Sequence, residues 1–163
     1  WLDGLVSSGW AFAYTLDDFT EADRNDFVAV KNQADGDSFA IINGNSNSGD
    51  VAIILREDGD QNWGFQTTSG GHVNDGNKHR VLVNKIGACS NDNLEIYVDN
   101  TSLATNQFFD ANPTNIFFSE PLKFFGQEFG RIWGPGIADN VIIYDDSLTS
   151  AQVQRDFDLQ PWT

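Results

Sequence analysis

The chain lacks the usual means of covalent stabilisation. Among its 163 residues there is one cysteine, Cys89, and there is no methionine. A single cysteine excludes an internal disulfide framework, and we expect Cys89 to be a small buried side chain. A chain of this length predicts one domain over residues 1–163, with a hydrophobic core of its own. Because the sequence opens with Trp1 and contains no methionine, we expect a processed form or an excised domain of a larger protein.

Positive charge is scarce. Nine Lys and Arg residues stand against 24 Asp and Glu residues, which gives a net charge of −15. Phosphate backbones and anionic lipids attract Lys and Arg, so this balance argues against a nucleic-acid partner and against docking on a membrane. Long apolar runs are also missing, and nothing in the sequence is long enough to span a bilayer. No N-terminal stretch has the charged-then-apolar pattern of a signal peptide.

Helical periodicity is nearly absent, and short alternating runs bounded by turn residues take its place. In the run 9–16, for example, Trp10, Phe12 and Tyr14 share one face. Many short strands without intervening helices favour an antiparallel sandwich or barrel over an alternating strand–helix fold. The strands that we predict cover residues 9–16, 27–31, 38–43, 51–56, 63–68, 79–86, 94–98, 101–105, 116–118, 122–125 and 137–144.

One short helix is well marked near the C-terminus. Thr149 and Gln152 have the spacing of a capping box, in which each side chain bonds the backbone amide of the other residue. Leu148 and Val153 flank this box as a hydrophobic staple. Phe157 follows Val153 by four residues, so we expect the two side chains to press one face of the helix onto a sheet.

The acidic residues are mostly of one kind. Nineteen of the 24 are Asp, and the chain also contains 16 Asn residues. Asp and Asn favour turns, and they also supply the oxygen ligands that calcium prefers. Composition leaves two interpretations open: solvated loops of an acidic β protein, or loops of which some hold calcium.

Three segments, in this order along the chain, resemble laminin-G-like, concanavalin-A-like domains. Residues 75–83 resemble the Asp-Gly-x-Trp-His-x-Val strand entry of that family, although Lys78 stands where the family often has Trp. Residues 93–100 resemble its Leu-x-Leu-Tyr-Val-Asp-Gly hairpin, with Asn100 in place of the turn glycine. Residues 136–153 resemble its closing strand and short helix, with Asn140 in place of the second acid.

The resemblance implies a two-sheet antiparallel jelly-roll sandwich. Its members are mostly extracellular, bind glycans or proteins, often hold calcium, and are often part of larger adhesins or carbohydrate-active enzymes. It also implies a metal site at an acid on the last long strand, here Asp139, with oxygens from the start of the chain, here Asp3. The alternative role for Asp139 is to cap a turn or to bond loop amides. A fold does not fix a function, so the ligand site needs separate evidence.

Sugar sites commonly stack an exposed aromatic ring on the pyranose face. Trp133, flanked by glycines, and Trp63, which follows a polar turn, are the candidate ligand-binding residues. The alternative for Trp133 is a plug over the end of the sandwich.

Catalysis has weaker support in the sequence. The glucanases of this fold carry a Glu-x-Asp-x-x-Glu strand, and the nearest match is residues 21–26, whose last acid is Asp and which lack strand-forming residues. No lyase signature accompanies the tyrosines, and His72 and His79 lack the partners of a zinc site. We therefore predict no catalytic residues. The leading hypothesis is an extracellular, non-catalytic, calcium-assisted glycan-binding module, on a cell surface or virion. The alternatives are a protein-binding adhesion or assembly domain, and a polysaccharide lyase or glycosidase.

Overall fold

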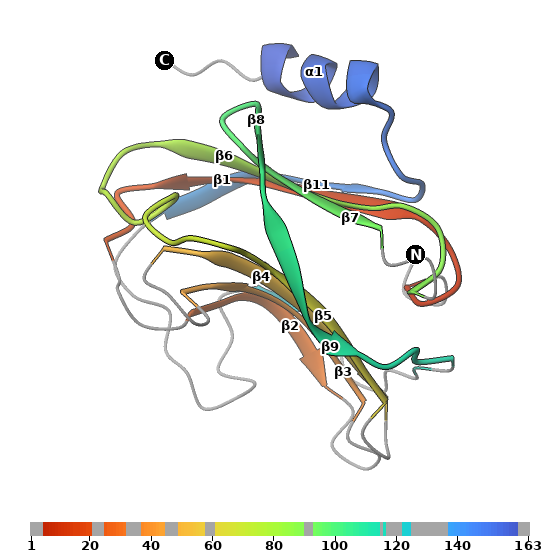
Figure 1. The fold of residues 1–163 in the computed structure, drawn as a ribbon. Helices are drawn as coiled ribbons and strands as arrows, with labels where there is room; N and C mark the ends of the chain where they lie inside the picture. Colours follow the sequence, from red (N-terminus) through yellow and green to blue (C-terminus); the bar gives the residue numbers. More distant parts are fainter. Residues whose placement is uncertain are drawn as a thin grey trace.

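Two antiparallel β-sheets lie face to face, and one helix covers the outer side of the first (Figure 1). The computed structural model describes residues 5–20, 25–31, 37–44, 49–57, 61–89, 93–114, 116, 122–124 and 137–159. The first sheet has five strands in the order β11-β1-β6-β7-β8. Their bounds are β1 Trp10–Asp17, β6 His79–Lys85, β7 Leu94–Val98, β8 Thr101–Leu103 and β11 Ile137–Tyr144.

The second sheet has six strands in the order β10-β2-β3-β4-β5-β9. Their bounds are β2 Asn25–Lys31, β3 Ser38–Asn43, β4 Val51–Glu57, β5 Gln61–Thr67, β9 Thr105–Asp110 and β10 Lys123–Phe124. The chain passes from the first sheet to the second between β8 and β9 (Figure 1). The predicted all-β sandwich with one short C-terminal helix is thus confirmed.

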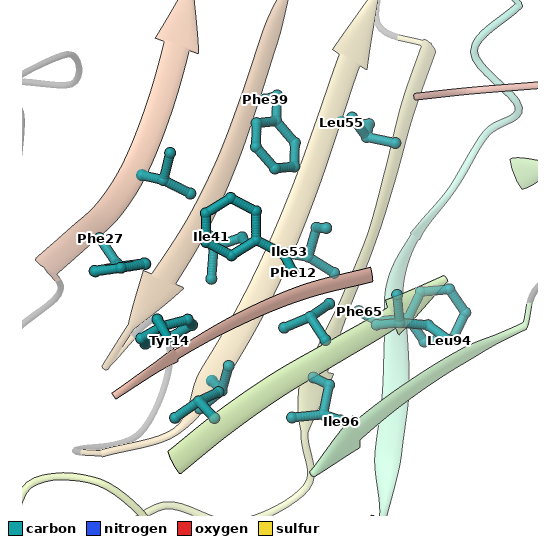
Figure 2. Close-up of a cluster of buried hydrophobic side chains, with 14 of the residues drawn as sticks. Phe12, Tyr14, Phe27, Phe39, Ile41, Ile53, Leu55, Phe65, Leu94 and Ile96 are labelled. Atoms are coloured by element: carbon teal, nitrogen blue, oxygen red, sulfur yellow. The ribbon is translucent and has the colours of Figure 1, made fainter. Parts of the chain in front are cut away.

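The core fills the space between the sheets because alternate residues of each strand point inward. On β1 the inward residues are aromatic, and Tyr14 stacks on Phe27 of β2 with 3.8 Å between the ring centroids. Figure 2 shows this cluster, in which side chains of both sheets interlock. Its labelled members are Phe12, Tyr14, Phe27, Phe39, Ile41, Ile53, Leu55, Phe65, Leu94 and Ile96. Cys89 is buried against the same core, as predicted.

The helix α1, Ser150–Leu159, begins where the capping box predicts. The Thr149 amide donates to Gln152 Oε1 over 2.8 Å, and the Gln152 amide donates to Thr149 Oγ1 over 3.4 Å. Val153 and Phe157 are buried against the outer face of the five-stranded sheet, and Leu148 packs on the same cluster. This second small core fixes α1 on the sheet.

The hairpin between β7 and β8 has a two-residue turn. Asp99 and Asn100 both have positive φ, 50° and 63°, which is the conformation that a type I′ hairpin turn requires. Val98 pairs with Thr101 directly across this turn. Asn tolerates this conformation at the position where the laminin-G-like domains that the sequence resembles have glycine.

Most predicted strands are present, and the errors have a simple cause. Strand β9 was not predicted, because Thr105-Asn106-Gln107 is polar and only Phe108 and Phe109 are strand formers. The strand predicted over 116–118 is not seen at Ile116, and its last two residues lie outside the described ranges. No helix in the described part of the chain is long and apolar enough to cross a membrane.

Candidate binding pockets beside the C-terminal helix

A buried ion pair joins α1 to the sheet beneath it. Arg80 of β6 is fully buried, and its Nε and Nη2 donate to the two carboxylate oxygens of Asp156 over 3.0 and 2.9 Å. Arg80 Nη1 donates to the carbonyl oxygen of Asn140 over 2.6 Å. The Tyr144 hydroxyl donates to Asp156 Oδ1 over 2.7 Å. Every charge in this group has a partner, and the bonds of the group hold the helix at a fixed position on the sheet.

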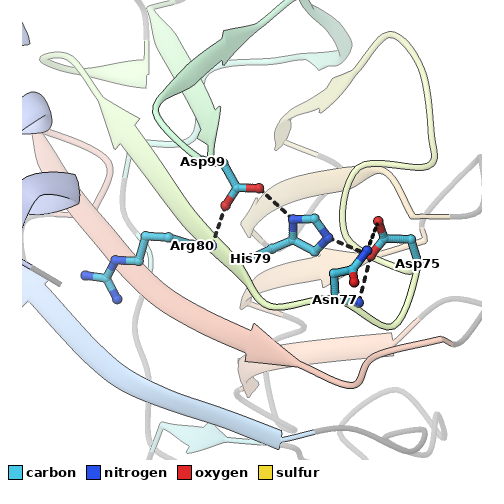
Figure 3. A network of polar contacts seen from close by, with 5 residues as sticks. All are labelled: Asp75, Asn77, His79, Arg80 and Asp99. Atoms are coloured by element: carbon cyan, nitrogen blue, oxygen red, sulfur yellow. Dashed lines mark hydrogen bonds and ion pairs between the residues drawn. The ribbon is translucent and has the colours of Figure 1, made fainter. Parts of the chain in front are cut away.

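A second polar network lies at the end of the sandwich, beside the β7–β8 hairpin (Figure 3). His79 is held between two carboxylates: Nδ1 is 2.7 Å from Asp99 Oδ2, and Nε2 is 2.8 Å from Asp75 Oδ1. Asp99 Oδ1 also accepts the Arg80 amide, and Asn77 bonds both oxygens of Asp75. We call the residues Asp75, Asn77, His79 and Asp99 the histidine clamp. It ties the loop before β6 to the tip of the hairpin.

The clamp holds a charged histidine. The hydrogen bond to Asp99 is the main cause that raises the pKa of His79 to about 9, and Asp75 adds to it against the opposing effect of burial. The hydrogen bond from His79 in turn lowers the pKa of Asp75. His79 is therefore an imidazolium at neutral pH, with both of its N–H groups donated to carboxylates.

Asp99 of the clamp and the end of α1 line the first pocket, an open hollow of about 340 Å³. Asn100 at the hairpin tip donates to Gln154 of α1 over 2.7 Å, and Gln154 donates to Asp158 over 2.8 Å. These bonds fix one wall of the pocket relative to the other. We call this cavity the hairpin pocket, and its lining residues are Lys78, Asp99, Asn100, Phe157 and Asp158.

The hairpin pocket offers both donors and acceptors. Asn100 uses its amide N–H toward Gln154, which leaves its side-chain oxygen as an acceptor. One carboxylate oxygen of Asp158 accepts from Gln154, and the other is available. Lys78 forms no ion pair within the described part of the chain. Mixed donors and acceptors at fixed positions are what a polyhydroxylated ligand requires.

The second pocket lies on the other flank of α1, between the helix and β11, and has a volume of about 350 Å³. It is more apolar than the first, and the only acid among its described lining residues is Asp156, which is already bound by Arg80 and Tyr144. We call it the β11 pocket, and its lining residues are Ile142, Tyr144, Leu148, Gln152, Arg155, Asp156 and Leu159.

The prediction that Trp63 stacks on a sugar is corrected by its position. Trp63 lies on β5 with its side chain inside the sandwich, 0% exposed, beside Phe65 at 5.0 Å between ring centroids. The ammonium of Lys85 lies 5.8 Å from the centre of the Trp63 ring. A ring enclosed in this way has no free face for a pyranose, so Trp63 belongs to the core. Trp133, the other aromatic candidate, lies outside the described residues.

The predicted calcium ligands are not brought together by any described contact. Asp139 is exposed on β11, opposite Thr15 of β1, and its Oδ1 accepts a hydrogen bond from the Asn140 side chain over 2.9 Å. Asp3 lies outside the described ranges, as do Glu21 and Asp23 of the glucanase-like segment. Within those ranges no group of three His, Cys, Asp or Glu side chains could hold a metal ion. Calcium at Asp139 stays a prediction.

Several residues around the pockets were missed from the sequence. Arg80 was not singled out, because charged residues on the outer face of a strand are usually solvated. Asp156 carried a usable signal, since it follows Val153 by three residues and therefore lies on the buried side of the helix. An acid on the buried face of a helix predicts a buried cation, and Arg80 on a strand beneath the helix is that cation.

The comparisons with known proteins identify the fold and no sequence family. No family model matches the chain, and no curated protein sequence matches it. Among solved structures, the CBM40 domain of the Ruminococcus gnavus IT-sialidase bound to α2,3-sialyllactose has a TM-score of 0.63 and 16% identity. That alignment covers 93% of this chain and 84% of the CBM40 chain. The fold is that of a lectin-like jelly roll.

Two larger proteins contain the same jelly roll. Domains LG4-5 of the mouse laminin α1 chain give a TM-score of 0.60 at 14% identity, over 90% of this chain and 38% of theirs. The binding domain of botulinum neurotoxin DC, in complex with rat synaptotagmin II, gives 0.62 at 13% identity, over 93% of this chain and 35% of its own. The predicted likeness to laminin-G-like and concanavalin-A-like domains is therefore confirmed for the fold. The chain spans little more than a third of these two structures.

Proposed function

We propose that this chain is a non-catalytic carbohydrate-binding module that works outside the cell as part of a larger protein. The observation that carries the proposal is the hairpin pocket, in which Lys78, Asn100 and Asp158 present donors and acceptors on two walls held together by hydrogen bonds. Support also comes from the jelly roll shared with a sialidase CBM40 domain that is bound to sialyllactose.

The chemistry of the hairpin pocket favours sugar hydroxyls. A hydroxyl both donates and accepts, so it can bridge an amide oxygen or carboxylate on one side and an ammonium on the other. Lys78 and the His79 imidazolium that bonds Asp99 balance the two Asp residues of the lining, whereas the whole chain carries a charge of −15. This excess of negative charge disfavours anionic sugars in the hairpin pocket and favours neutral ones.

The state of the pocket acids favours binding over catalysis. A glycosidase needs one carboxyl group free to donate a proton and a second free to attack or to activate water. Both oxygens of Asp99 already accept hydrogen bonds, from the Arg80 amide and from His79. Among the described lining residues, Asp158 is then the only acid with an available oxygen, and a paired-carboxylate mechanism requires two.

The test is a glycan array followed by calorimetric titration of a neutral hit. We expect Asn100→Ala and Asp158→Ala each to weaken binding by about fivefold to twelvefold, because each removes a hydrogen bond worth about 1–1.5 kcal/mol. Asn106→Ala is the matched control, since Asn106 is an exposed amide on β9 and does not line the pocket. Absence of binding to every glycan would contradict the proposal, and turnover of a polysaccharide would replace it with an enzyme.

A protein partner is the second candidate function. Strand β11 exposes apolar side chains at the end of its sheet, with Ile137 62% and Ile143 39% exposed. The botulinum neurotoxin DC domain of the same fold is in complex with a protein, rat synaptotagmin II. Capture of one defined protein that free sugars do not displace, and that Ile143→Asp abolishes, would favour this alternative.

A further inference from the structure

Strand β11 is the outermost strand of the five-stranded sheet and pairs with β1 along one of its edges. It has eight residues, whereas β8, at the other end of the same sheet, has three. The outer edge of such a strand presents backbone N–H and C=O groups that no described strand takes up. Of the two ends of this sheet, β11 is therefore the one long enough to pair with a further strand.

The side of β11 that faces the second sheet is apolar and exposed. Ile143 pairs with Phe12, a core residue of β1, so both side chains point between the sheets. Val141 lies two residues earlier on the same face, and the two are 39% and 37% exposed. Phe124 of β10 is 40% exposed, and its ring centroid is 6.3 Å from that of Phe12. We call Phe124, Val141 and Ile143 the edge patch.

The opposite face of β11 borders the β11 pocket, in which Ile142 lies with Leu148 and Leu159. The large apolar side chains that are exposed in the described part of the chain all lie on β10, on β11 or at the end of α1. Successive residues of a strand point to opposite faces of its sheet. A strand added beside β11 would therefore place alternate side chains on the edge patch and in the β11 pocket.

A β-bulge limits where such a strand can pair. Two residues of β11, Asn140 and Val141, stand opposite Tyr14 alone. Asn140 has a φ of 50°, and its carbonyl oxygen accepts Arg80 Nη1 over 2.6 Å, so the bulge is held from inside the molecule. The regular part of the edge after the bulge is residues 141–144, and it includes both β11 members of the edge patch.

Carboxylates stand at both ends of this apolar stretch. Asp139 precedes the bulge and Asp145 follows the strand; both are exposed, and neither takes part in an ion pair with a described residue. These charges disfavour a second copy of the chain, because antiparallel pairing centred on Ile142 would set Asp139 of one copy against Asp145 of the other, between two molecules of charge −15. Basic residues at the ends of an added strand would meet opposite charges instead.

We propose that β11 docks an extended segment of a partner protein as an added strand, with three apolar residues at its centre and a basic residue at each end. The residue opposite Ile142 enters the β11 pocket, its two neighbours lie on the edge patch, and the basic ends reach Asp139 and Asp145. Main-chain hydrogen bonds supply affinity in such pairing, and alternate side chains supply specificity. This inference develops the second candidate function and does not depend on glycan binding by the hairpin pocket.

The experiment is a calorimetric and NMR titration of the whole chain with capped heptapeptides. The probe is Lys-Thr-Val-Ile-Val-Thr-Lys, which reads the same in both directions. Glu-Thr-Val-Ile-Val-Thr-Glu tests the charge, and Lys-Thr-Ser-Thr-Ser-Thr-Lys tests unspecific attraction to an acidic protein. We expect the probe to bind at least tenfold more tightly than either. Its advantage over the Glu-ended peptide should shrink severalfold between about 20 and 300 mM NaCl, because salt screens exposed charges.

Methylation of the peptide backbone tests whether the probe pairs as a strand. N-methyl groups on both Val residues remove the donors along one edge of the peptide, and N-methyl groups on Ile and both Thr residues remove those along the other. Because only one edge faces β11, one of these peptides should bind at least tenfold more weakly and the other within about threefold of the probe. The unaltered chain is used, so no variant has to fold. Equal affinities, or equal losses, would contradict strand addition.

Two substitutions assign the binding to β11. Ile143→Asp should weaken the probe tenfold or more, because it places a carboxylate in the edge patch. Asp145→Asn should reduce the preference for the Lys-ended over the Glu-ended peptide about threefold. Asp110→Asn is the matched control and should leave that preference unchanged, since it removes the same charge from an exposed position on β9, at the far end of the other sheet from β10.

The outcomes separate this inference from glycan binding. If the probe binds as expected and no glycan does, the inference stands and the proposed carbohydrate-binding function fails. If glycans bind but the probe does not, or if Ile143→Asp leaves the affinity of the probe unchanged, the inference fails and the proposed function stands. If the chain alone sediments as a dimer that Ile143→Asp disperses, the occupant of β11 is a second copy, and the assignment to a basic partner is overturned.

Discussion

The two flanks of α1 share one floor and offer opposite chemistry. On the hairpin flank, Asp158 and Asn100 add acceptors to the single cation Lys78. On the β11 flank, Arg155 adds a charge to a largely apolar surface. Between them, Asp156 is bound by Arg80 and keeps no free charge for either pocket. Four consecutive helical residues thus serve three different surfaces.

This division follows from helical geometry. Successive residues are turned by about 100° around the axis, so Arg155, Asp156 and Asp158 point to different sides of the helix. Val153 and Phe157 decide which side is buried, and the remaining residues are then assigned to one flank or the other. The effect of a substitution on α1 therefore depends on the side of the helix that the residue occupies, and it reaches one pocket, both or neither.

The largest expected effect is the loss of stability that follows when the ion pair between Arg80 and Asp156 is removed. Asp156→Ala leaves the buried Arg80 guanidinium without its counter-ion, which typically costs about 3–5 kcal/mol. We expect the midpoint of urea unfolding to fall strongly, and both pockets to lose their ligands, because α1 loses its main polar attachment.

The control for this change lies next to it in sequence. Arg155→Ala removes an exposed side chain of the same helix and should alter the free energy of unfolding by no more than about 0.5 kcal/mol. Equal stability of Asp156→Ala and Arg155→Ala would show that the ion pair does not fix the helix. The two pockets would then not depend on a common ion pair.

An intermediate loss of stability should appear as pH rises, because the histidine clamp beside the hairpin pocket loses its proton. The pKa of His79 is raised from 6.5 to about 9, so the folded state binds this proton more tightly than the unfolded chain. The clamp's contribution is then complete below about pH 6.5, declines above it, and is lost as pH passes 9. Allowing for solvent screening, we expect a loss on the order of 1–2 kcal/mol, or roughly 2–4 °C in Tm per kcal/mol.

His79→Gln provides the comparison. Glutamine keeps a neutral donor in the clamp and cannot titrate, so its Tm should not show the additional decline between pH 6.5 and 9. Binding of a neutral glycan should weaken over the same range only in the parent chain. A parallel pH dependence in the parent and His79→Gln would refute the role of the clamp.

The smallest expected effect concerns calcium. If Asp139 of β11 is a ligand, as the sequence predicts, calcium bound to the folded state raises stability by only about 0.4 kcal/mol at a concentration equal to its Kd. Chelator should lower Tm, and Asp139→Asn should reduce that response, whereas Asp145→Asn, on an exposed turn just after β11, should not. An identical melt with calcium and with chelator would remove the metal from the proposal.

The fold was accessible from the sequence because its determinants are local. Alternation in β1 and β7, the Asp99–Asn100 turn and the Thr149–Gln152 box each specify structure within a few residues. The strand that failed, β9, is held by its partner β5 and not by its own composition. Gly64 of β5 leaves the space that Phe108 and Phe109 fill, since a Cβ there would lie 3.1 Å from Phe108.

The pockets were not accessible in the same way, because they depend on contacts between distant segments. Arg80 and Asp156 are 76 positions apart, and Asn100 and Gln154 are 54 apart. Trp63 was expected at the surface because it follows a polar turn. Alternate residues of β5 point inward, and Trp63 is one of them. Residue types indicated what each side chain can do, and the tertiary fold decided where it does so.

The pairing of β1 with β11 has a consequence for biosynthesis. The earliest strand of the chain lies between β6 and the last strand, so one of its edges stays without a partner until residues 137–144 have been made. An unpaired strand rich in aromatic residues is prone to aberrant association while the ribosome is still translating. Completion of the first sheet therefore waits for β11, and a chain stalled or shortened before residue 137 is expected to be captured by chaperones or degraded.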